Sequence, residues 1–308
     1  MTAPFFQTSG NLLADRRYTF GQELAERGDA AGAADLFAQA VELAPAFVSA
    51  WFALGETRAR LDEKSVAIDA FRKVLALDPA DRHGAGLHLM RLQAKGLGGM
   101  PPDYVRSLFD QYAARFDTAL VEGLAYRGPE LLRVSVEAAC AAAGRRASFR
   151  MALDLGCGTG LGGAAIRPLA GRLIGVDLSP KMVEQAKAKK LYDRLVVENL
   201  VTFLKLQSDA VFDVVFAADV FAYFADLAPL AVACARVLEP GGLLAFSVET
   251  HAGDGVILGE KLRFAHARTH VRAAIAAAGL RLLTLDDAVT RNDGNMPVPG
   301  LIAVAARD

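Results

Sequence analysis

Seven short apolar runs, separated by amphipathic stretches, follow Gly144 and constrain the fold more than any other feature. Apolar runs that alternate with helical segments predict parallel βαβ units in a doubly wound sheet. The runs are MALDL (151–155), RLIGVDL (172–178), RLVVENL (194–200), FDVVFAADV (212–220), GLLAFSV (242–248), LRLLTL (280–285) and GLIAVAA (300–306). The last two are joined by TRNDGNMPVPG, which is too short and turn-rich for a crossover helix. We therefore predict an α/β sheet whose last two strands pair antiparallel.

A glycine-rich turn, GCGTGLGG (156–163), follows the first run. Glycines let the backbone approach a ligand closely, and the N-terminus of the helix that follows favours negative charge. The pattern alone also satisfies the dinucleotide fingerprint. Two acidic residues distinguish a dinucleotide site from a site for a positively charged ligand. Asp154 lies shortly before the glycines, where it would repel a pyrophosphate and attract an ammonium group. Asp177 lies near the end of the second run, where it can accept hydrogen bonds from both ribose hydroxyls. The turn thus favours a positively charged nucleoside over a diphosphate.

The first ninety residues match themselves at an offset of 34 residues. The matching pairs are Gly21 and Gly55, Ala33 and Ala67, Phe37 and Phe71, and Pro45 and Pro79. Small residues let two antiparallel helices approach, and a proline ends each unit. The offset is the period of tetratricopeptide repeats, and residues 14–79 resemble that family.

Two repeats leave apolar surface uncovered, because each unit buries its face only against a neighbour. The segment Arg82–Lys95 has apolar residues at helical spacing and is predicted to cap them. The repeats could hold a partner peptide or acyl carrier, cover the second domain, or pair with a second copy as a homodimer.

A linker rich in glycine and proline separates the repeats from the rest of the chain. We predict a helical repeat domain over residues 1–95, a linker over 96–102 and a second domain over 103–308. The second domain begins with helices up to Ala143, in which Tyr104, Leu108, Tyr112 and Phe116 share one face.

The segments DLGCGTG and GVDLSPKMVEQA resemble the first two motifs of class I S-adenosylmethionine-dependent methyltransferases. Together with the repeats, they make nearly the whole chain resemble the bacterial tetratricopeptide-containing methyltransferases. The resemblance implies a Rossmann-like seven-stranded sheet with an antiparallel last strand, preceded by an all-α repeat domain. It also implies S-adenosylmethionine as cofactor, with Gly156, Gly158 and Gly160 under its methionine moiety and Asp154 near its amino group.

The resemblance assigns further cofactor contacts along the sheet edge. Asp177 would accept the ribose hydroxyls, and Leu178 would flank the adenine. Either Asn199 or Glu198 would accept from the adenine amine, and the Leu200 N–H would donate to the ring. Asp219 stands where cofactor and substrate should meet. The segments QYAARFD (111–117) and YRGP (126–129) resemble a helical cap, in which Tyr112 and Arg127 are candidates for the methionine carboxylate.

Ordinary structural roles compete with some of these assignments. Asp154 could cap a helix, and Asp177 precedes Ser179, itself a helix cap with Pro180 after it. Asp219 could cap the following helix, and Arg127 could pair with Glu122 or Glu130 on a solvated face.

A base is needed only if the acceptor must lose a proton. The candidates are His251 and His266, and Thr250–Gly259 is predicted to be a mobile substrate loop. Arg263 would share a helix face with His266 if Lys261–Ala278 is helical. No group of acids beyond Asp219 indicates a metal, and we predict none.

Composition narrows the function. The net charge is −1 and is balanced on both sides of Lys95, which disfavours nucleic acid as partner or substrate. Three widely spaced cysteines, no signal-like leader and no apolar run of membrane length predict a soluble cytoplasmic protein. We expect a methyltransferase that acts on a small molecule, with oxygen as the acceptor atom. The alternatives are a protein or carrier-bound substrate recruited by the repeats, a binding protein without turnover, and an NAD-dependent reductase.

Overall fold

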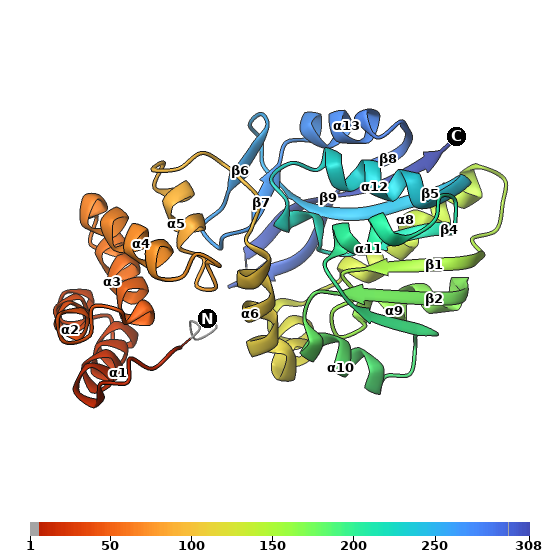
Figure 1. Cartoon of the computed structure of the whole chain (residues 1–308). Helices are drawn as coiled ribbons and strands as arrows, with labels where there is room; N and C mark the ends of the chain where they lie inside the picture. Colours follow the sequence, from red (N-terminus) through yellow and green to blue (C-terminus); the bar gives the residue numbers. More distant parts are fainter. Residues whose placement is uncertain (1–5, 295) are drawn as a thin grey trace. The chain divides into compact units, whose positions relative to one another are not determined.

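The computed structural model of the chain describes residues 6–294 and 296–308. Its contacts divide the chain into two compact units, one ending at Gln111 and the other starting at Tyr112 (Figure 1). The division falls at the end of helix α6 (Pro102–Tyr112), a helix that we had expected to belong to the second domain. The boundaries at 95 and 103 therefore stay a prediction.

Two helical hairpins make up most of the first unit. Their helices are α1 (Leu12–Glu26), α2 (Ala30–Leu43), α3 (Val48–Arg60) and α4 (Lys64–Leu77). A Cβ on Gly21 would lie 2.6 Å from the Phe37 ring, and one on Gly55 would lie 2.8 Å from the Phe71 ring. Positions 34 residues apart thus make the same close helix contact, for which only glycine leaves room. The identity of these hairpins as tetratricopeptide repeats stays a prediction.

A short helix, α5 (Ala85–Arg91), follows the second hairpin within the predicted capping segment. The Asp81 carboxylate starts it by accepting a hydrogen bond of 2.7 Å from the Ala85 N–H. Its Leu89 is buried in one cluster with Phe71 of α4. A helix therefore covers the second hairpin, although it is shorter than predicted.

The second unit begins with short helical segments and then alternates strands with helices. The first part comprises η1 (Ala113–Arg115), α7 (Phe116–Thr118), η2 (Ala119–Gly123) and α8 (Gly128–Ala142). The strands are β1 (Phe149–Leu155), β2 (Ala170–Asp177), β3 (Arg194–Val197), β4 (Phe212–Ala217), β5 (Leu238–Thr250), β6 (Val256–Leu258), β7 (Phe264–His266), β8 (Leu280–Asp293) and β9 (Met296–Arg307). Between them lie α9 (Leu161–Ile166), η3 (Arg167–Leu169), α10 (Pro180–Ala188), α11 (Leu200–Leu206), η4 (Phe221–Tyr223), α12 (Ala228–Val237) and α13 (Arg268–Ala277).

The sheet confirms the predicted architecture in its main strands. β3, β2, β1, β4 and β5 are neighbours in that order and run parallel, whereas β9 runs antiparallel between β5 and β8. Each of the seven apolar runs contains all or part of one of these strands, and the last two form the expected antiparallel pair. The sheet has nine strands rather than seven, because the hairpin of β6 and β7 adds to the end of β5. Part of the expected substrate loop, Val256–Leu258, is therefore a strand.

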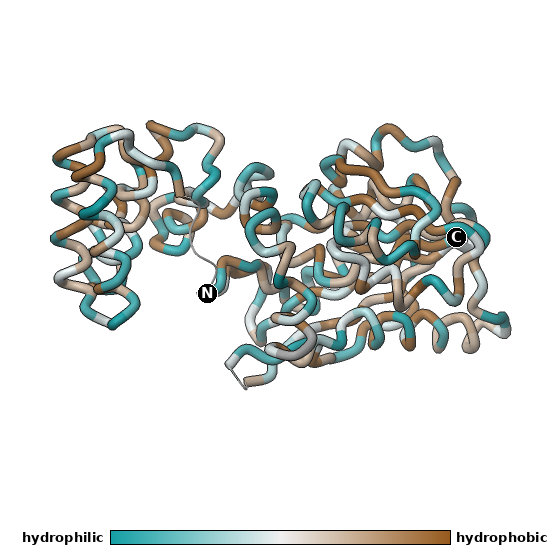
Figure 2. The backbone as a smooth tube through the Cα atoms, turned by 90° about the horizontal axis from the view of Figure 1, so that it is seen from below, coloured by the Kyte–Doolittle hydropathy of each residue, from teal (hydrophilic) through white to brown (hydrophobic). Residues whose placement is uncertain are grey.

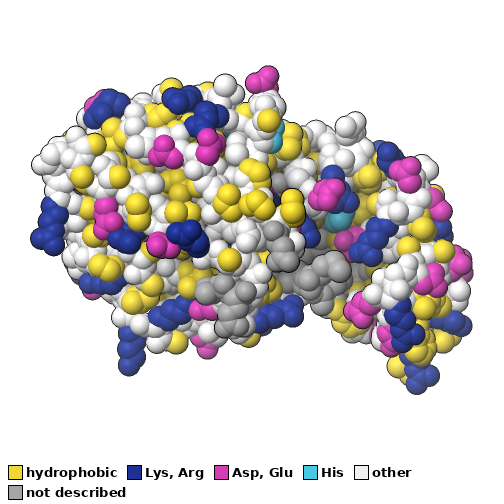
Figure 3. All heavy atoms as spheres, turned by 180° about the vertical axis from the view of Figure 1, so that it is seen from behind, with side chains coloured by type: hydrophobic (Ala, Val, Ile, Leu, Met, Phe, Trp, Pro, Cys, Tyr) yellow, Lys and Arg dark blue, Asp and Glu magenta, His cyan; other side chains and the backbone are white. Residues whose placement is uncertain are grey.

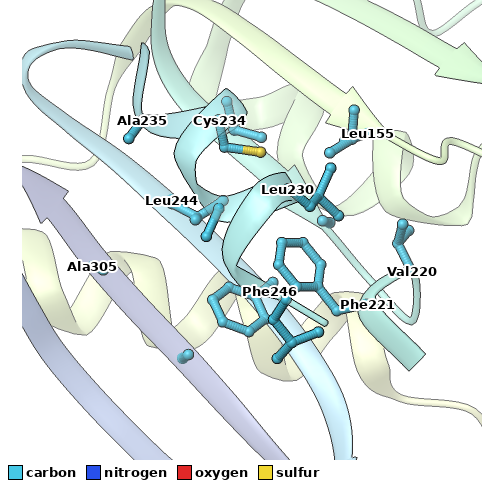
Figure 4. Packing of buried hydrophobic residues seen from close by; sticks show 14 of the residues in the cluster. Leu155, Val220, Phe221, Leu230, Cys234, Ala235, Leu244, Phe246 and Ala305 are labelled. Carbon is cyan, nitrogen blue, oxygen red and sulfur yellow. The ribbon is translucent and has the colours of Figure 1, made fainter. Parts of the chain in front are cut away.

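Both faces of the sheet are buried under helices. Along β4, Val214 and Phe216 belong to the cluster with α8 and α9, whereas Val215 belongs to the cluster with α11, α12 and α13. Successive residues of a strand point to opposite faces, so a continuous apolar run fits a sheet covered on both sides. On the second face the rings of Phe221 and Phe246 stack with centroids 4.1 Å apart (Figure 4). Figure 2 shows hydrophobic and hydrophilic segments alternating along the chain.

The surface in Figure 3 carries acidic and basic side chains interspersed with apolar ones. Within the described ranges, no helix combines the length and the apolar character that crossing a bilayer requires. The apolar runs of this chain are explained by their burial between the helices on the two faces of the sheet.

Candidate functional site

The turn between β1 and α9 holds three glycines in the left-handed backbone region. Their φ angles are 74° at Gly156, 51° at Gly158 and 96° at Gly160, values that strain a residue with a side chain. A Cβ on Gly156 would also lie 2.5 Å from Val220. A Cβ on Gly158 would meet nothing within 4 Å, so the backbone there faces open space in which a ligand can lie.

Asp177, at the end of β2, is bound to this turn. One carboxylate oxygen accepts from the Gly158 N–H at 2.9 Å and the other from the Ser179 N–H at 2.8 Å. Ser179 in turn caps α10, since its hydroxyl accepts from the Met182 N–H at 3.1 Å. The Asp177 carboxylate is therefore fixed between the glycine turn and the cap of α10, and its role towards a ribose stays a prediction.

Asp154, near the end of β1, is 1% exposed. Its carboxylate accepts a hydrogen bond of 2.6 Å from the Tyr192 hydroxyl. Burial raises the pKa of Asp154 to about 7; the hydrogen bond from Tyr192 opposes this rise, the charge of Asp177 adds to it, and the N–H of Gly163 opposes it. The Gly163 N–H lies in the first turn of α9, but the N-cap of that helix is Gly160, so Asp154 contacts the start of the helix without being its cap residue. A carboxyl group that is about half ionised near neutral pH is unusual in a core.

The segment after β3 differs from the prediction in its local structure. The run 194–200 ends as a strand at Val197, and Asn199 is the N-cap of α11. The Asn199 side-chain oxygen accepts from the N–H groups of Val201 and Thr202 at 3.0 and 3.3 Å. Glu198 accepts from the Asn199 N–H at 2.7 Å. Of the two candidates, Asn199 thus already uses its oxygen for the helix.

Leu178 and Leu200 complete the predicted edge of the sheet. Leu178 is half-buried directly after β2, and Leu200 is half-buried at the first position of α11. Backbone N–H groups in the first turn of a helix have no partner within the helix. The Leu200 N–H is therefore a suitable donor for a ligand beside β3.

The predicted helical cap is tied to the glycine turn by a residue that the sequence did not single out. Asp117, in α7, accepts a hydrogen bond from the Thr159 hydroxyl in the turn. Its other oxygen lies 2.5 Å from the ammonium of Lys189, directly after α10. The only sequence signal is the position of Asp117 at the end of QYAARFD.

Tyr112 and Arg127, the two candidates from this cap, have other contacts in the described structure. The Tyr112 ring packs edge-on against Phe116 at 5.6 Å, with the Arg115 guanidinium 5.4 Å from its centroid. The Arg127 side chain is 60% exposed and lies 3.4 Å from Glu130, one of the two expected acidic partners. The side chain of the other, Glu122, lies outside the described residues. A solvated ion pair thus accounts for the side chain of Arg127.

A buried cluster of four charged side chains, Asp219, Glu249, Arg263 and Arg291, lies at the carboxyl ends of β4 and β5. Asp219 pairs with Arg263 at 2.7 Å and with Arg291 at 3.2 Å, and both arginines also bind Glu249. All four side chains are at most 16% exposed. We call them the ion cluster.

Of the ion cluster, the sequence analysis named Asp219 as a site residue and Arg263 only as a neighbour of His266. Its backbone is left-handed, with a φ of 64°, and its N–H donates to the Ser247 hydroxyl at 2.9 Å. The N-cap of the following η4 is Val220, so the alternative of Asp219 as a helix cap is wrong. Glu249 ends an apolar run, which is a weak signal, whereas nothing in the sequence pairs Arg291 with either acid.

The members of the ion cluster keep one another charged despite burial. Burial alone would raise the pKa of Glu249, but Arg263 and Arg291 hold it below its usual range. Burial likewise opposes the charge of Arg263, whose pKa is nevertheless raised by Asp219, Tyr223 and Glu249. The Tyr223 hydroxyl accepts from Arg263 at 2.6 Å, and the guanidinium lies 4.8 Å from the centre of its ring.

The two histidines differ from the expected picture of a catalytic base. His266 is fully buried and stacks on His270 at 5.3 Å. Burial, together with His270, lowers the pKa of His266 to about 4. His251 accepts from the Gly253 N–H through Nδ1 at 3.1 Å. The helix expected to hold Arg263 and His266 on one face begins only at Arg268, because 264–266 is strand β7.

These groups suit a positively charged ligand better than a diphosphate. Two carboxyl groups accept hydrogen bonds from this glycine-rich segment, Asp177 from the Gly158 N–H and Asp154 from the Gly163 N–H. In the part of the chain that the structure describes, no three His, Cys, Asp or Glu side chains form a metal-binding group. The site therefore fits an adenosyl group that carries an amine and a sulfonium.

Comparisons with known proteins agree with this geometry. The family described as "Methyltransferase domain" matches residues 153–246. The chain is 32% identical over 179 residues to human "Methyltransferase-like protein 27", a match that spans 57% of this chain and 70% of that protein. It is also 32% identical over 98 residues to a "Ubiquinone biosynthesis O-methyltransferase" of Xanthomonas oryzae. That second match spans 31% of this chain and 41% of the relative.

Among solved structures, the chain resembles the 1,6-didemethyltoxoflavin-N1-methyltransferase of Burkholderia thailandensis, determined with bound 1,6-didemethyltoxoflavin and S-adenosylhomocysteine. The TM-score is 0.52 at 17% identity, and the match covers 69% of this chain and 92% of that one. At 17% identity, this similarity shows a shared fold and nothing further.

Proposed function

We propose that this chain, which belongs to the class I S-adenosylmethionine-dependent methyltransferases, transfers a methyl group to an oxygen atom of a small molecule. Its cofactor, S-adenosylmethionine, supplies the methyl group on a sulfonium and thus carries its own leaving group. The observation that carries the proposal is the pair Asp154 and Asp177, whose carboxyl groups accept from the Gly163 and Gly158 N–H groups of the same glycine-rich segment.

On the cofactor side, we assign each group by its place at the carboxyl ends of the strands and by the hydrogen bonds that it makes. The Asp177 carboxylate, held beside the glycine turn by the Gly158 and Ser179 N–H groups, is assigned to the ribose hydroxyls. Glu198, rather than Asn199, is assigned to the adenine amine, because the Asn199 oxygen already caps α11. The Leu200 N–H donates to the adenine ring, and Leu178 packs against it.

On the acceptor side, the ion cluster forms a rigid charged wall beyond β4 and β5. Its members come from strands β5 and β8, from the segment after β4 and from the segment before β7, so they fix these four parts of the sheet relative to one another. Transfer needs the acceptor atom, the methyl carbon and the sulfur in line, with water excluded. We propose that the wall orients the acceptor for this geometry.

Neither histidine is arranged as a strong base in the described structure. His266 is a weak base because its pKa lies near 4. Neutral His251 carries its proton on Nε2, since Nδ1 accepts from Gly253, and Nε2 then donates rather than accepts. An acceptor oxygen that is already anionic, such as a carboxylate or an acidic phenol, needs no such base. The O-methyltransferase among the relatives supports oxygen as the acceptor atom.

The experiment is methyl transfer from a radiolabelled donor to a metabolite extract, with a parallel protein extract. The proposal expects label in small acidic or phenolic compounds, released by base if the product is an ester. Label confined to nitrogen compounds would contradict it. Label on protein, lost when residues 1–95 are removed, would favour the alternative in which the repeated hairpins recruit a protein or carrier-bound substrate.

A further inference from the structure

A tyrosine outside both cofactor motifs reaches into the site. Tyr192 lies in the connection between α10 and β3, and its hydroxyl donates to Asp154 at 2.6 Å. The register of β1 and β2 places Gly175 opposite Asp154, and the Tyr192 ring packs on that glycine. The phenol therefore crosses β2 to reach the carboxylate at the end of β1.

Three glycines leave room for this side chain. A Cβ on Gly163 would lie 2.2 Å from the Tyr192 hydroxyl, one on Gly175 2.7 Å from the ring, and one on Gly160 3.3 Å from it. The first two distances are shorter than any real contact of a Cβ. The third glycine of the Gly158-x-Gly160-x-x-Gly163 pattern is thus explained by the phenol, not by a phosphate.

The surroundings of Asp154 make this hydrogen bond decisive for its charge. Within the described residues, the ionisable groups whose charges act on Asp154 include Asp177, Cys157, Tyr126 and Tyr192, and each of these four is neutral or negative. The ionised form is favoured by the Tyr192 hydroxyl and by the Gly163 N–H. Losing the hydroxyl leaves a buried carboxylate with one fewer donor, which shifts the group towards its protonated form.

We propose that Tyr192 is a positioning residue, which keeps Asp154 ionised and directed at the amino group of the cofactor's methionine moiety. The inference rests on the proposed role of Asp154 in holding that amine, directly or through one water. Tyr192 itself touches no reacting atom in this assignment, and it acts through Asp154.

The test is calorimetric binding of S-adenosylhomocysteine, which has the same amine, from pH 5.5 to 8.5. Wild-type affinity should fall as the pH falls through about 7, because Asp154 then becomes protonated. Tyr192→Phe should bind about tenfold more weakly than wild type at pH 6 and within about twofold of it at pH 8.5. A residue with only a packing role would lower affinity equally at every pH.

Three further variants separate the outcomes. Asp154→Asn should give a pH-independent affinity, and adding Tyr192→Phe to it should change nothing further. Gly163→Ala displaces the phenol and should reproduce the pH shift of Tyr192→Phe. Tyr18→Phe removes another buried hydroxyl, in the first unit, and should leave the profile unchanged.

The possible failures are distinguishable. If the wild type binds no S-adenosylhomocysteine at any pH, the proposed cofactor site is wrong. If the wild type binds but the Tyr192→Phe profile runs parallel to it, the cofactor site stands and the role of Tyr192 is overturned. An additive loss in the double variant would likewise overturn it.

Discussion

Two pairs of acidic side chains lie at the carboxyl edge of the sheet, and different kinds of groups bind them. At β1 and β2, Asp154 and Asp177 are bound by backbone N–H groups and a phenol. At β4 and β5, Asp219 and Glu249 are bound by two arginines. The hydrogen bonds described above for the first pair come from neutral donors, whereas those of the second pair come from guanidinium groups. In our proposal, the half of the edge at β1 and β2 binds the charged cofactor, and the half at β4 and β5 orients the acceptor.

The largest effect should follow from breaking the ion cluster. Arg291→Ala leaves Asp219 and Glu249 buried with one guanidinium between them, so the free energy of unfolding should fall by about 3–5 kcal/mol. Urea denaturation measures this loss. The matched control is Arg281→Ala, whose side chain is 60% exposed and pairs with Asp308; it should cost less than about 1 kcal/mol. Equal losses in the two variants would remove the distinction between the halves.

The second prediction concerns the pH dependence of stability without cofactor. The folded pKa of Asp154, about 7, lies above its unfolded value, so the protonated carboxyl stabilises the fold at low pH. This contribution is lost as the pH rises towards 7. Between pH 5 and pH 8, wild type should lose about 2–3 kcal/mol relative to Asp154→Asn in its free energy of unfolding. Chemical denaturation at a series of pH values measures the difference, and a constant difference would show that Asp154 is not destabilised by its burial.

The third prediction tests the cofactor half directly. Asp177→Ala removes the acceptor assigned to both ribose hydroxyls, so affinity for S-adenosylmethionine should fall about 10- to 100-fold. Calorimetric titration measures the change. Asp286→Ala, an exposed residue on β8, is the control and should bind as wild type does. Unchanged affinity in Asp177→Ala would end the assignment of this edge to the nucleoside.

The features that the sequence could predict are those formed by residues close to one another along the chain. Apolar runs and turn residues are local, so the parallel order and the antiparallel last pair followed from them. Asp154, Asp177 and the glycines lie within 24 residues of one another, and a short motif can encode their geometry. The hairpin of β6 and β7 was missed because each strand has only three residues.

The ion cluster could not be predicted, because it depends on long-range contacts. Arg291 is 72 residues from Asp219 and 42 from Glu249, and it meets them only once β8 has paired with β9. Tyr192 was missed for a related reason: its partner lies 38 residues away, and the glycines that admit it resemble ligand-binding glycines. Asn199 has a structural role that the sequence analysis did not consider, since its side chain caps α11, and its role towards the adenine stays a prediction.

The smallest effect is expected for an ion pair that is more exposed to solvent than the pairs of the ion cluster. Asp117 and Lys189 pair at 2.5 Å with 42% and 30% of their side chains exposed, whereas Asp219 and Arg263 are each 15% exposed. Water and salt screen the shallower pair, so its coupling energy in a double-mutant cycle of Asp117→Ala and Lys189→Ala should be below about 1 kcal/mol. It should shrink further in 1 M salt, where the screening length is about 3 Å. A coupling as large and as insensitive to salt as that of Asp219 with Arg263 would mean that the helical cap, too, is held by a desolvated ion pair.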